Sequence, residues 1–441
     1  MSPVAEETEV FRTRFDRLAA TRAEADPGWL RPIRTAAMAR FSERGFPSTR
    51  DEAWRYTSVS PIARTPFRPG EKGSLGGPAE RALAELRIAG HRGTEAVFVN
   101  GRHVPELSTV LSDGARVLSL REALDGDEEG LPRHLTRVSG HDQNVFADLN
   151  AAFIEDGACV FVAPEHRVAE PIHLLFLSTN PEGSPTVSHP RVLVVAGRGS
   201  EAKVVESYGG PDGQVYLTNT VTEVVVGDGA ALDHTKVQRE GLQAFHVATL
   251  ATTLGRNARF SSHAISLGGS LVRDDVNVVF DDEGAECALN GLFMATGTQH
   301  MDTHTRVDHA RPHGTSRELY KGILDGKARG VFDGKVLVRK DAQKTDAHQA
   351  NKNLLLSKEA LVNSTPALEI LANDVKCKHG STTGQLDPAA LFYLRSRGIG
   401  EAAARNLLTY AFASDLVQRI RVDAIRASLE RHLQSRLGGL R

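Results

Sequence analysis

Short runs of alternating hydrophobic and polar residues fill the middle of the chain. From about residue 95, strand-like runs recur between turns rich in Gly, Asp and Asn; examples are AVFVN, RVLVVAG, VTEVVVG, VNVVF and KVLVRK. No amphipathic helix of full length interrupts them between Arg191 and Leu356. Because the parallel strands of a doubly wound sheet need helical crossovers, the pattern excludes that class and leaves a sandwich, a barrel or a solenoid.

Two segments of this region are weakly alike. VVVGDGAALDH begins at Val224 and VVFDDEGAECAL begins at Val278, and each joins a β-rich run to an acidic glycine turn and a second alternating run. Such repetition is typical of the stacked coils of a β-helix. Because the period is loose, the pattern alone favours a β-helix only slightly over a sandwich.

Helical periodicity marks both ends of the chain. Phe11, Phe15 and Leu18 form one stripe, and a second helical pattern stops at Gly45. Asp387, followed by proline, is a typical helix N-cap, and amphipathic patterns follow it. This last helical region is too small to bury a core unaided, so we expect it to pack on the β region or on a partner.

These sequence patterns predict that the chain is divided into four segments. They are an N-terminal helical domain over residues 1–60, a linker rich in Pro, Gly and Arg over 61–94, a β core over 95–385, and a C-terminal helical domain over 386–441.

Composition and charge narrow the function classes. The chain has 441 residues, a formal net charge of -2 and 40% hydrophobic residues, which suits a soluble globular protein of two or three domains. Because the net charge is close to zero, the chain has no overall positive potential that would attract nucleic acid or an anionic membrane. There is no long apolar run, and the charged start MSPVAEETEVFRTRF lacks the apolar core of a signal peptide. We therefore expect a cytoplasmic protein.

Three cysteines limit the metal chemistry. Cys159, Cys287 and Cys377 are odd in number and far apart, which does not suit a disulfide framework. They cannot supply the four thiolates that an iron-sulfur cluster usually takes. Any metal bound here needs other ligands or ligands from a partner.

The stretch NDVKCKHG places Cys377 two residues before His379. On an extended chain both side chains face the same side, whereas Lys378 faces the other. Two ligands are too few for a metal site. From the residues alone, a small buried cysteine and a turn histidine are therefore favoured over metal binding.

Two glycine-rich patterns resemble nucleotide motifs without meeting their requirements. The fingerprint over residues 197–202 precedes another strand pattern rather than a helix, so a hairpin turn is the favoured interpretation. The segments 322–328 and 330–336 have one residue too few between their glycines and lack Ser or Thr after the lysine. We predict no ATP site in this chain.

The segment HMDTHTRVDHARPH, from His300 to His313, is the densest histidine region. Zinc needs three or four converging ligands, and histidines four residues apart on a strand share a face but lie far apart. A polar surface or a subunit contact is therefore favoured over a metal site, whose candidate ligands would be His300, His304, His309, His313, Asp302 and Asp308.

The run from Ser316 carries a family resemblance. SRELYKGILDGKARGVFDGKVLVRKDAQKTDAHQANKNLLLS, then PALEILANDVKCKHGSTTGQLD and LFYLRSRGI, resembles the signature of the SufB/SufD family, the non-ATPase subunits of the SufBCD complex that assembles iron-sulfur clusters. GFPSTRDEAWRYT, from Gly45, and HMDTHTRVDH also fit. The similarity extends from residue 45 to about residue 400.

Within that family the chain resembles SufD more than SufB. SufB proteins usually have a carboxylate on each side of the histidine that matches His379, and here the neighbours are Lys378 and Gly380. SufB proteins also carry a cysteine at the position where this chain has Ala360.

The resemblance implies a mainly β protein, with a right-handed parallel β-helix core flanked by N-terminal and C-terminal α-helical domains. It implies pairing with a SufB-like subunit through the β-helix and docking of a SufC-like ABC ATPase on the C-terminal helices. His379, and with even odds Cys377, would be ligands for iron or a nascent Fe-S cluster shared transiently with SufB. The sequence does not indicate whether a reduced flavin binds.

The leading hypothesis is thus a non-catalytic assembly subunit of a SufBCD complex. The alternative is a SufB-like scaffold that forms a homodimer when alone and builds a cluster by itself. A β-helix that acts on polysaccharide is a third interpretation, which no secretion signal supports.

Overall fold

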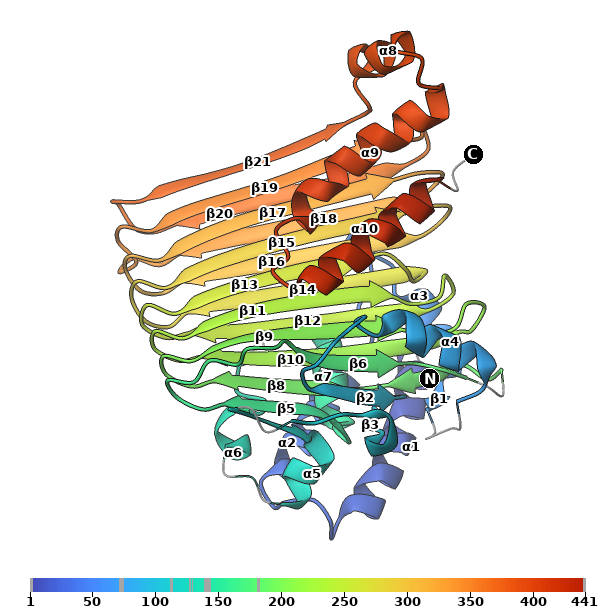
Figure 1. Ribbon diagram of the computed structural model, residues 1–441. Coiled ribbons are helices and arrows are strands. Elements are labelled where there is room, and N and C mark those ends of the chain that lie inside the picture. Colours follow the sequence, from blue (N-terminus) through green and yellow to red (C-terminus); the bar gives the residue numbers. More distant parts are fainter. Residues whose placement is uncertain are drawn as a thin grey trace.

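The core of the protein is a parallel β-solenoid of about seven turns (Figure 1). The computed structural model describes residues 3–70, 75–111, 114–126, 128, 130–138, 144–180 and 183–438. Each turn of the solenoid adds one strand to each of two sheets, and each strand pairs in parallel with the strand one turn away. The predicted mainly β class and the β-helix are confirmed, and the sandwich is wrong.

Consecutive strands along the chain alternate between the two sheets. The first sheet contains β8 (Arg191–Ala196), β10 (Tyr216–Val226), β12 (Phe245–Leu254), β14 (Leu271–Phe280), β16 (His300–His309), β18 (Arg329–Val338) and β20 (Leu361–Ile370). The second sheet contains β9 (Glu201–Gly209), β11 (Ala231–Arg239), β13 (Arg259–Ser266), β15 (Glu286–Ala295), β17 (Thr315–Leu324), β19 (Asp346–Leu355) and β21 (Lys376–Gly384).

Smaller elements extend the sheets and close the N-terminal end of the solenoid. The strands are β1 (Arg68–Pro69), β2 (Glu95–Val99), β3 (Arg102–His103), β4 (Ala115–Ser119), β5 (Gly157–Val162), β6 (Ile172–Leu177) and β7 (Thr186–Ser188). The helices are η1 (Glu52–Trp54), α3 (Ser60–Arg64), η2 (Pro105–Leu107), α5 (Leu120–Asp125) and α6 (Leu131–His134).

The interior of the solenoid is the main hydrophobic core. Because side chains alternate across a strand, each strand sends every second residue inward. Inward residues of successive turns stack on one another, as Phe176 does on Tyr208 with ring centroids 4.9 Å apart. This stacking places hydrophobic residues of both sheets, such as Val194 of β8 and Leu232 of β11, in one continuous cluster.

The corners between the sheets use tight turns. Residues 197–200 join β8 to β9, and Gly199 has φ +66°, a conformation that favours glycine. The two strands lie in different sheets and do not pair with each other. The glycine fingerprint is therefore a corner of the solenoid, and the predicted hairpin turn is wrong.

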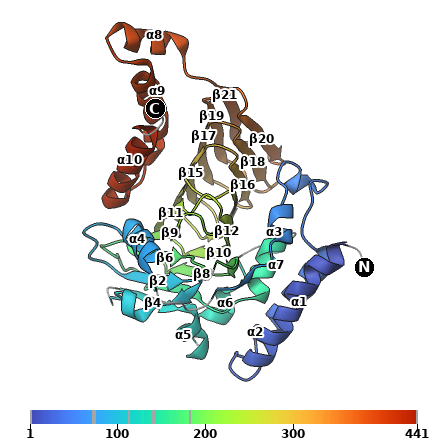
Figure 2. The same ribbon diagram turned by 90° about the vertical axis from the view of Figure 1, so that its right-hand side faces the viewer.

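N-terminal helices cover the outer face of the first sheet near its start (Figure 2). Helices α1 (Pro3–Arg22), α2 (Leu30–Arg44) and α7 (Val145–Ala152) bury Phe11, Phe15 and Phe41 in a cluster that includes Leu193 of β8. Two residues of the predicted stripe, Phe11 and Phe15, thus lie on the face that packs toward the sheet.

One helix lies in the segment predicted as a linker. Helix α4 (Gly77–Leu86) packs Leu83 and Leu86 against Leu175 and Leu177 of β6. Residues 71–74 of that segment lie outside the described residues.

The C-terminal helices cover the outer face of the second sheet. Helices α9 (Glu401–Val417) and α10 (Asp423–Gly438) bury Leu416 and Leu429 against outward residues such as Val237 and Ile323. Helix α8 (Pro388–Ser396) stands away from the strands and buries no residue (Figure 2). None of the described helices has the length and apolarity to span a bilayer.

A buried ion pair joins the N-terminal helices to the solenoid. The guanidinium of Arg191 is fully buried; its Nη2 lies 2.8 Å from Oε2 of Glu223, and its Nη1 donates to Asn150 Oδ1 at 3.0 Å. Glu223 also accepts from the backbone N–H of Thr136 at 2.9 Å. The pair therefore connects β8, β10 and α7.

We expect Arg191→Met to lower the free energy of unfolding by about 3 to 5 kcal/mol, because the substitution leaves Glu223 charged and buried without its cation. The double variant Arg191→Met/Glu223→Gln should recover more than half of that loss. Urea denaturation followed by circular dichroism measures both. Equal losses in the single and double variants would contradict a dominant role for the pair.

Candidate functional site

Cys377 and His379 lie on the last strand of the solenoid. Strand β21 pairs with β19 so that Cys377 faces Ala347 and His379 faces Gln349. Ala347 and Gln349 are buried inward residues, so Cys377 and His379 share the inward side and Lys378 lies on the outer side. The two candidate ligands are therefore adjacent inward positions on one strand.

The solenoid is open at this end. Neither β20 nor β21 contains a buried residue. In β18 and β19, the strands beneath them, at least half of the residues are buried. His379 is exposed, whereas Cys377 is partly buried against the interior core. Because no described strand covers this turn, residues that would be core elsewhere in the solenoid face solvent here.

A polar column continues beneath His379. Gln349 lies one turn below it and donates from Nε2 to Oε1 of Glu318, one turn further down, at 3.1 Å. Gly334 of β18 faces this column, and a Cβ there would lie 2.5 Å from Nε2 of Gln349. The missing side chain makes room for the amide inside the solenoid.

Burial makes the carboxyl group of Glu318 a weaker acid than an exposed glutamate. Desolvation raises its pKa to about 7, against weaker opposing hydrogen bonds from Thr305 and Gln349. Its Oε2 atom has no hydrogen-bond partner among the described residues. A carboxyl group that is half protonated near neutral pH thus lies two turns below His379.

A second polar chain runs beside this column. Ser381 on β21 donates to Ser364 at 2.8 Å, Ser364 donates to Asn351 Oδ1 at 2.8 Å, and Asn353 donates to the same oxygen at 2.5 Å. The interior of the last three turns therefore holds these polar groups beside apolar residues such as Phe332 and Val336.

The three cysteines differ in their access to a ligand. Cys159 and Cys287 are fully buried, and burial raises the pKa of each thiol. Burial also raises the pKa of Cys377, but this side chain is partly open to solvent. Cys377 is therefore a protonated thiol at neutral pH, and a metal would have to displace its proton.

Donors for a complete metal site are not gathered in one place. Among the residues that the structure describes, no three His, Cys, Asp or Glu side chains lie together in a way that could hold a metal ion. Cys377 and His379 offer one sulfur and one imidazole nitrogen, which are ligands that iron accepts. A site here would need ligands from another subunit.

The histidine-rich strand β16 holds its side chains apart. His300 bonds Thr57 at 2.8 Å, His304 bonds Asp302 at 3.0 Å, and His309 stacks on Phe280 with ring centroids 4.1 Å apart. The segment does not form a metal centre in the described residues. The interpretation as polar surface is wrong for His309, which is fully buried.

The sequence pattern alone did not identify Glu318 and Gln349 as residues of the site. Both lie in the quoted segments SRELYKG and DAHQANKN, where every second residue is inward. The feature that could have identified them is a polar residue at a position that faces the interior of the solenoid. Without the register of the coils, however, the inward set could not be distinguished from the outward set.

The fold and this site define a β-solenoid protein with cysteine, histidine and other polar side chains at an open coil end. Comparison with known families agrees with that class. Residues 176–412 match the model described as the SufBD core domain of the SUF system for FeS cluster assembly, and residues 6–174 match the SufBD protein N-terminal region. The chain belongs to the SufBD family.

Relatives of known name support a closer placement. An iron-sulfur cluster assembly SufBD family protein of Synechocystis is 34% identical, with 88% of this chain and 87% of the relative covered. The iron-sulfur cluster assembly protein SufD of Escherichia coli is 31% identical over 90% of both chains. Protein ABCI7, chloroplastic, of Arabidopsis thaliana is 31% identical over 96% of this chain and 89% of its own. This chain is a SufD homologue.

We expect Glu318→Gln to change how stability depends on pH. The folded state holds a proton on Glu318 up to about pH 7, whereas the unfolded chain loses it near pH 4.5, so stability from this group falls as the pH rises between those values. From pH 5 to pH 8 the variant should therefore lose on the order of 2 kcal/mol less than the wild type.

Urea denaturation at both pH values measures the difference. Glu369→Gln is the matched control, because Glu369 is an exposed carboxylate on the neighbouring turn that pairs with Lys335. A variant that follows the wild-type pH profile would show that Glu318 titrates normally in the folded state.

Proposed function

We propose that this chain is the SufD-like subunit of an iron-sulfur cluster assembly complex. In this proposal it pairs with a SufB-like subunit at the open coil end and recruits a SufC-like ABC ATPase through its C-terminal helices. The iron or nascent cluster is cargo that is held between the subunits, and this chain has no turnover of its own.

The position of His379 is the observation that carries the proposal. Its side chain lies on the inward face of the last strand and is exposed, and the imidazole has no hydrogen-bond partner among the described residues. A neutral imidazole there can complete a set of thiolate ligands from a partner. Cys377 can join the same site only if its raised pKa is overcome by a metal.

The edges of β20 and β21 support the pairing. An uncovered strand edge presents unpaired backbone N–H and C=O groups, which are a template for another strand. Hydrophobic side chains at the two ends of β20, Leu361 and Ile370, are also exposed. A partner that adds strands here would bury these groups and cover His379.

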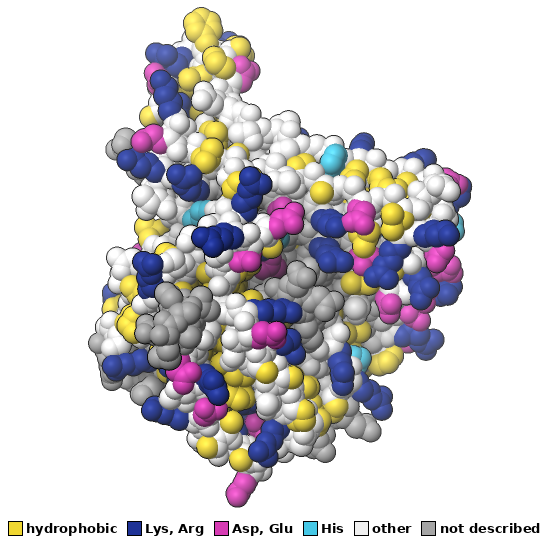
Figure 3. Space-filling model, turned by 180° about the vertical axis from the view of Figure 1, so that it is seen from behind, with side chains coloured by type: hydrophobic (Ala, Val, Ile, Leu, Met, Phe, Trp, Pro, Cys, Tyr) yellow, Lys and Arg dark blue, Asp and Glu magenta, His cyan; other side chains and the backbone are white. Residues whose placement is uncertain are grey.

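Helix α8 supports docking of a further subunit. Phe392 is 73% exposed and Tyr393 is 61% exposed, and Figure 3 shows hydrophobic side chains at the tip of this projecting helix. Large aromatic side chains on a helix without a packing partner are typical anchors of protein interfaces. Leu407 of α9 adds to the same apolar character.

A contact between α9 and β17 can couple movement of the C-terminal helices to the solenoid. Lys321 of β17 donates to Asp415 at 2.7 Å and to the carbonyl of Phe412 at 2.9 Å. The same strand carries Glu318, the base of the polar column under His379. In the proposed cycle, ATP-driven dimerisation of the ATPase moves α9, and the strand transmits this shift to the open end.

Replacing the proposed ligand tests the site. In a complex reconstituted from this chain, a SufB-like subunit and a SufC-like ATPase, His379→Ala should slow cluster assembly roughly tenfold, because one metal ligand is lost. Cluster formation is followed by visible absorbance and iron content. Lys378→Ala, on the opposite face of the same strand, is the matched control and should assemble at the wild-type rate.

An unchanged rate for His379→Ala would refute the assignment. Cys377→Ser in the same assay decides whether the thiol is a ligand or a packing group. Reconstitution of the chain alone with iron and sulfide tests the homodimeric alternative, since a stable chromophoric cluster without the SufB-like subunit would support it.

Loss of the aromatic anchors tests the docking helix. Phe392→Ser/Tyr393→Ser should weaken binding of the SufC-like ATPase by about tenfold or more, because the apolar area available for burial is removed. Titration calorimetry measures the affinity. The control Leu242→Ser/Tyr56→Ser removes exposed hydrophobic side chains elsewhere. Equal weakening in both pairs would place the docking surface away from α8.

A further inference from the structure

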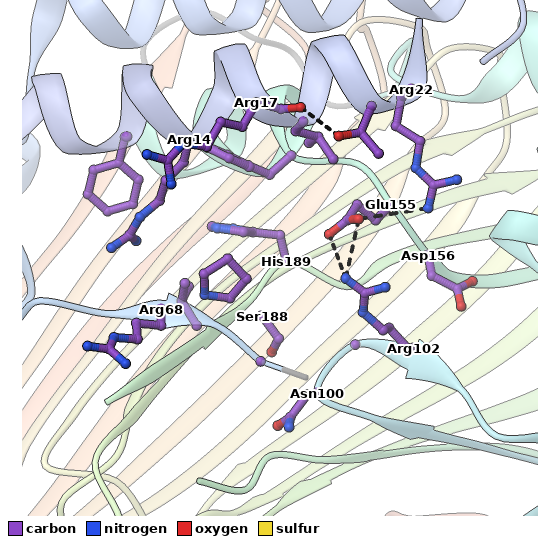
Figure 4. Close-up of a pocket in the computed structure, with 18 residues that line it drawn as sticks. Arg14, Arg17, Arg22, Arg68, Asn100, Arg102, Glu155, Asp156, Ser188 and His189 are labelled. Carbon is purple, nitrogen blue, oxygen red and sulfur yellow. Dashed lines mark hydrogen bonds and ion pairs between the residues drawn. The ribbon is translucent and has the colours of Figure 1, made fainter. Parts of the chain in front are cut away.

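A cavity of about 850 Å³ is lined by residues of α1, β1 and β3, and these elements lie at the opposite end of the solenoid from β21 (Figure 1). Figure 4 shows it between helix α1 and the segments that carry Asn100, Ser188 and His189. Five arginines line it: Arg14, Arg17, Arg22, Arg68 and Arg102. They come from α1, β1 and β3, so the folded structure gathers cations that are far apart in the sequence.

Only part of this charge is neutralised inside the cavity. Arg22 and Arg102 share Glu155, at 3.9 and 3.3 Å. The other acidic lining residue, Asp156, already accepts hydrogen bonds from three backbone N–H groups, those of His103, Arg121 and Gly157. Its capacity to accept bonds from arginine is therefore small.

Three guanidinium groups have no acidic partner. Arg14, Arg17 and Arg68 form no ion pair with any described residue, although surface arginines elsewhere in the protein commonly do. Burial, and then the positive charges of Arg68 and Arg17, lower the pKa of Arg14. Mutual repulsion of this kind is relieved when an anion binds between the cations.

The wall between the two groups of arginines is rigid and neutral. His189 stacks on Phe153 with ring centroids 5.2 Å apart and planes 17° apart, and burial lowers its pKa to about 3. Its Nδ1 accepts from the side-chain amide of Asn219 at 3.1 Å, which leaves the hydrogen on Nε2. A neutral imidazole N–H can donate to an anion without adding charge.

We propose that this cavity binds a small molecule that carries adjacent phosphate groups. Guanidinium groups form paired hydrogen bonds with phosphate oxygens, and three uncompensated cations match a ligand with more than two negative charges. The net charge of the whole chain is only -2, so the attraction is local to the cavity and does not draw in polyanions generally. Free pyrophosphate and a nucleoside polyphosphate share this chemistry.

Calorimetric titration of the full chain at low salt tests the proposal, with inorganic pyrophosphate, ATP and citrate as probes. Pyrophosphate should bind with one-to-one stoichiometry. Arg14→Gln/Arg68→Gln should weaken that binding by about tenfold or more, because each lost guanidinium removes charge-assisted hydrogen bonds. Arg17→Gln, at an exposed position of the same helix, is a second variant that does not disturb packing.

The control Arg12→Gln/Arg64→Gln removes the same charge from exposed positions of α1 and α3 outside the cavity, and its affinity should match the wild type. Tighter binding of ATP than of pyrophosphate would identify the nucleotide as the source, and the reverse would identify the free anion. The proposal is overturned by the absence of saturable binding, by equal weakening in the control, or by citrate binding as tightly as pyrophosphate.

Discussion

The backbone ladder between successive turns is the constraint on which the rest of the structure depends. Each strand satisfies its N–H and C=O groups by pairing with the strand one turn before and one turn after it, so every turn needs neighbours on both sides. At the N-terminal end the antiparallel strands β3 and β4, together with the helices around them, close the stack. At the other end no described strand follows β20 and β21. Within the described residues the solenoid therefore has one closed end and one end where the outermost strands leave backbone N–H and C=O groups unpaired.

The register of that ladder also decides where the chemistry lies. A parallel in-register stack places equivalent inward residues directly above one another, which produces the column of Glu318, Gln349 and His379. A neighbouring column runs through Cys287 and Ser316 to Cys377. Deep in the solenoid the residues of these columns are buried in the core. On the last turn the equivalent residues, Cys377 and His379, are partly or fully open to solvent. The exposure of Cys377 and His379 at this end thus results from the end of the stack and not from a separate pocket.

The helical parts attach to the β-solenoid on different faces. The N-terminal helices are fixed to the first sheet by the buried hydrogen bond from Arg191 to Asn150 of α7 and by apolar packing, and α1 borders the arginine-lined cavity. The C-terminal helices α9 and α10 pack on the second sheet, where Lys321 joins a helix to the strand that carries Glu318. Helix α8 continues beyond the sheet and buries nothing. The arginine-lined cavity, the exposed helix α8 and the open coil end with His379 therefore lie on separate parts of the molecule.

The sequence by itself determined the local features. The missing crossover helices excluded a doubly wound sheet, the spacing of Phe11 and Phe15 predicted a packed helix, Asp387 predicted the start of α8, and the period of two placed Cys377 and His379 on one face. The quoted motifs identified the family, because such runs of specific residues do not depend on knowing the register. Only the tertiary structure decided which strands are neighbours, because pairs about 30 residues apart are set by the whole stack and not by local pattern. For that reason the corner at Gly199, the helix α4, the pKa of Glu318 and the gathering of arginines around His189 could not be read from the chain alone.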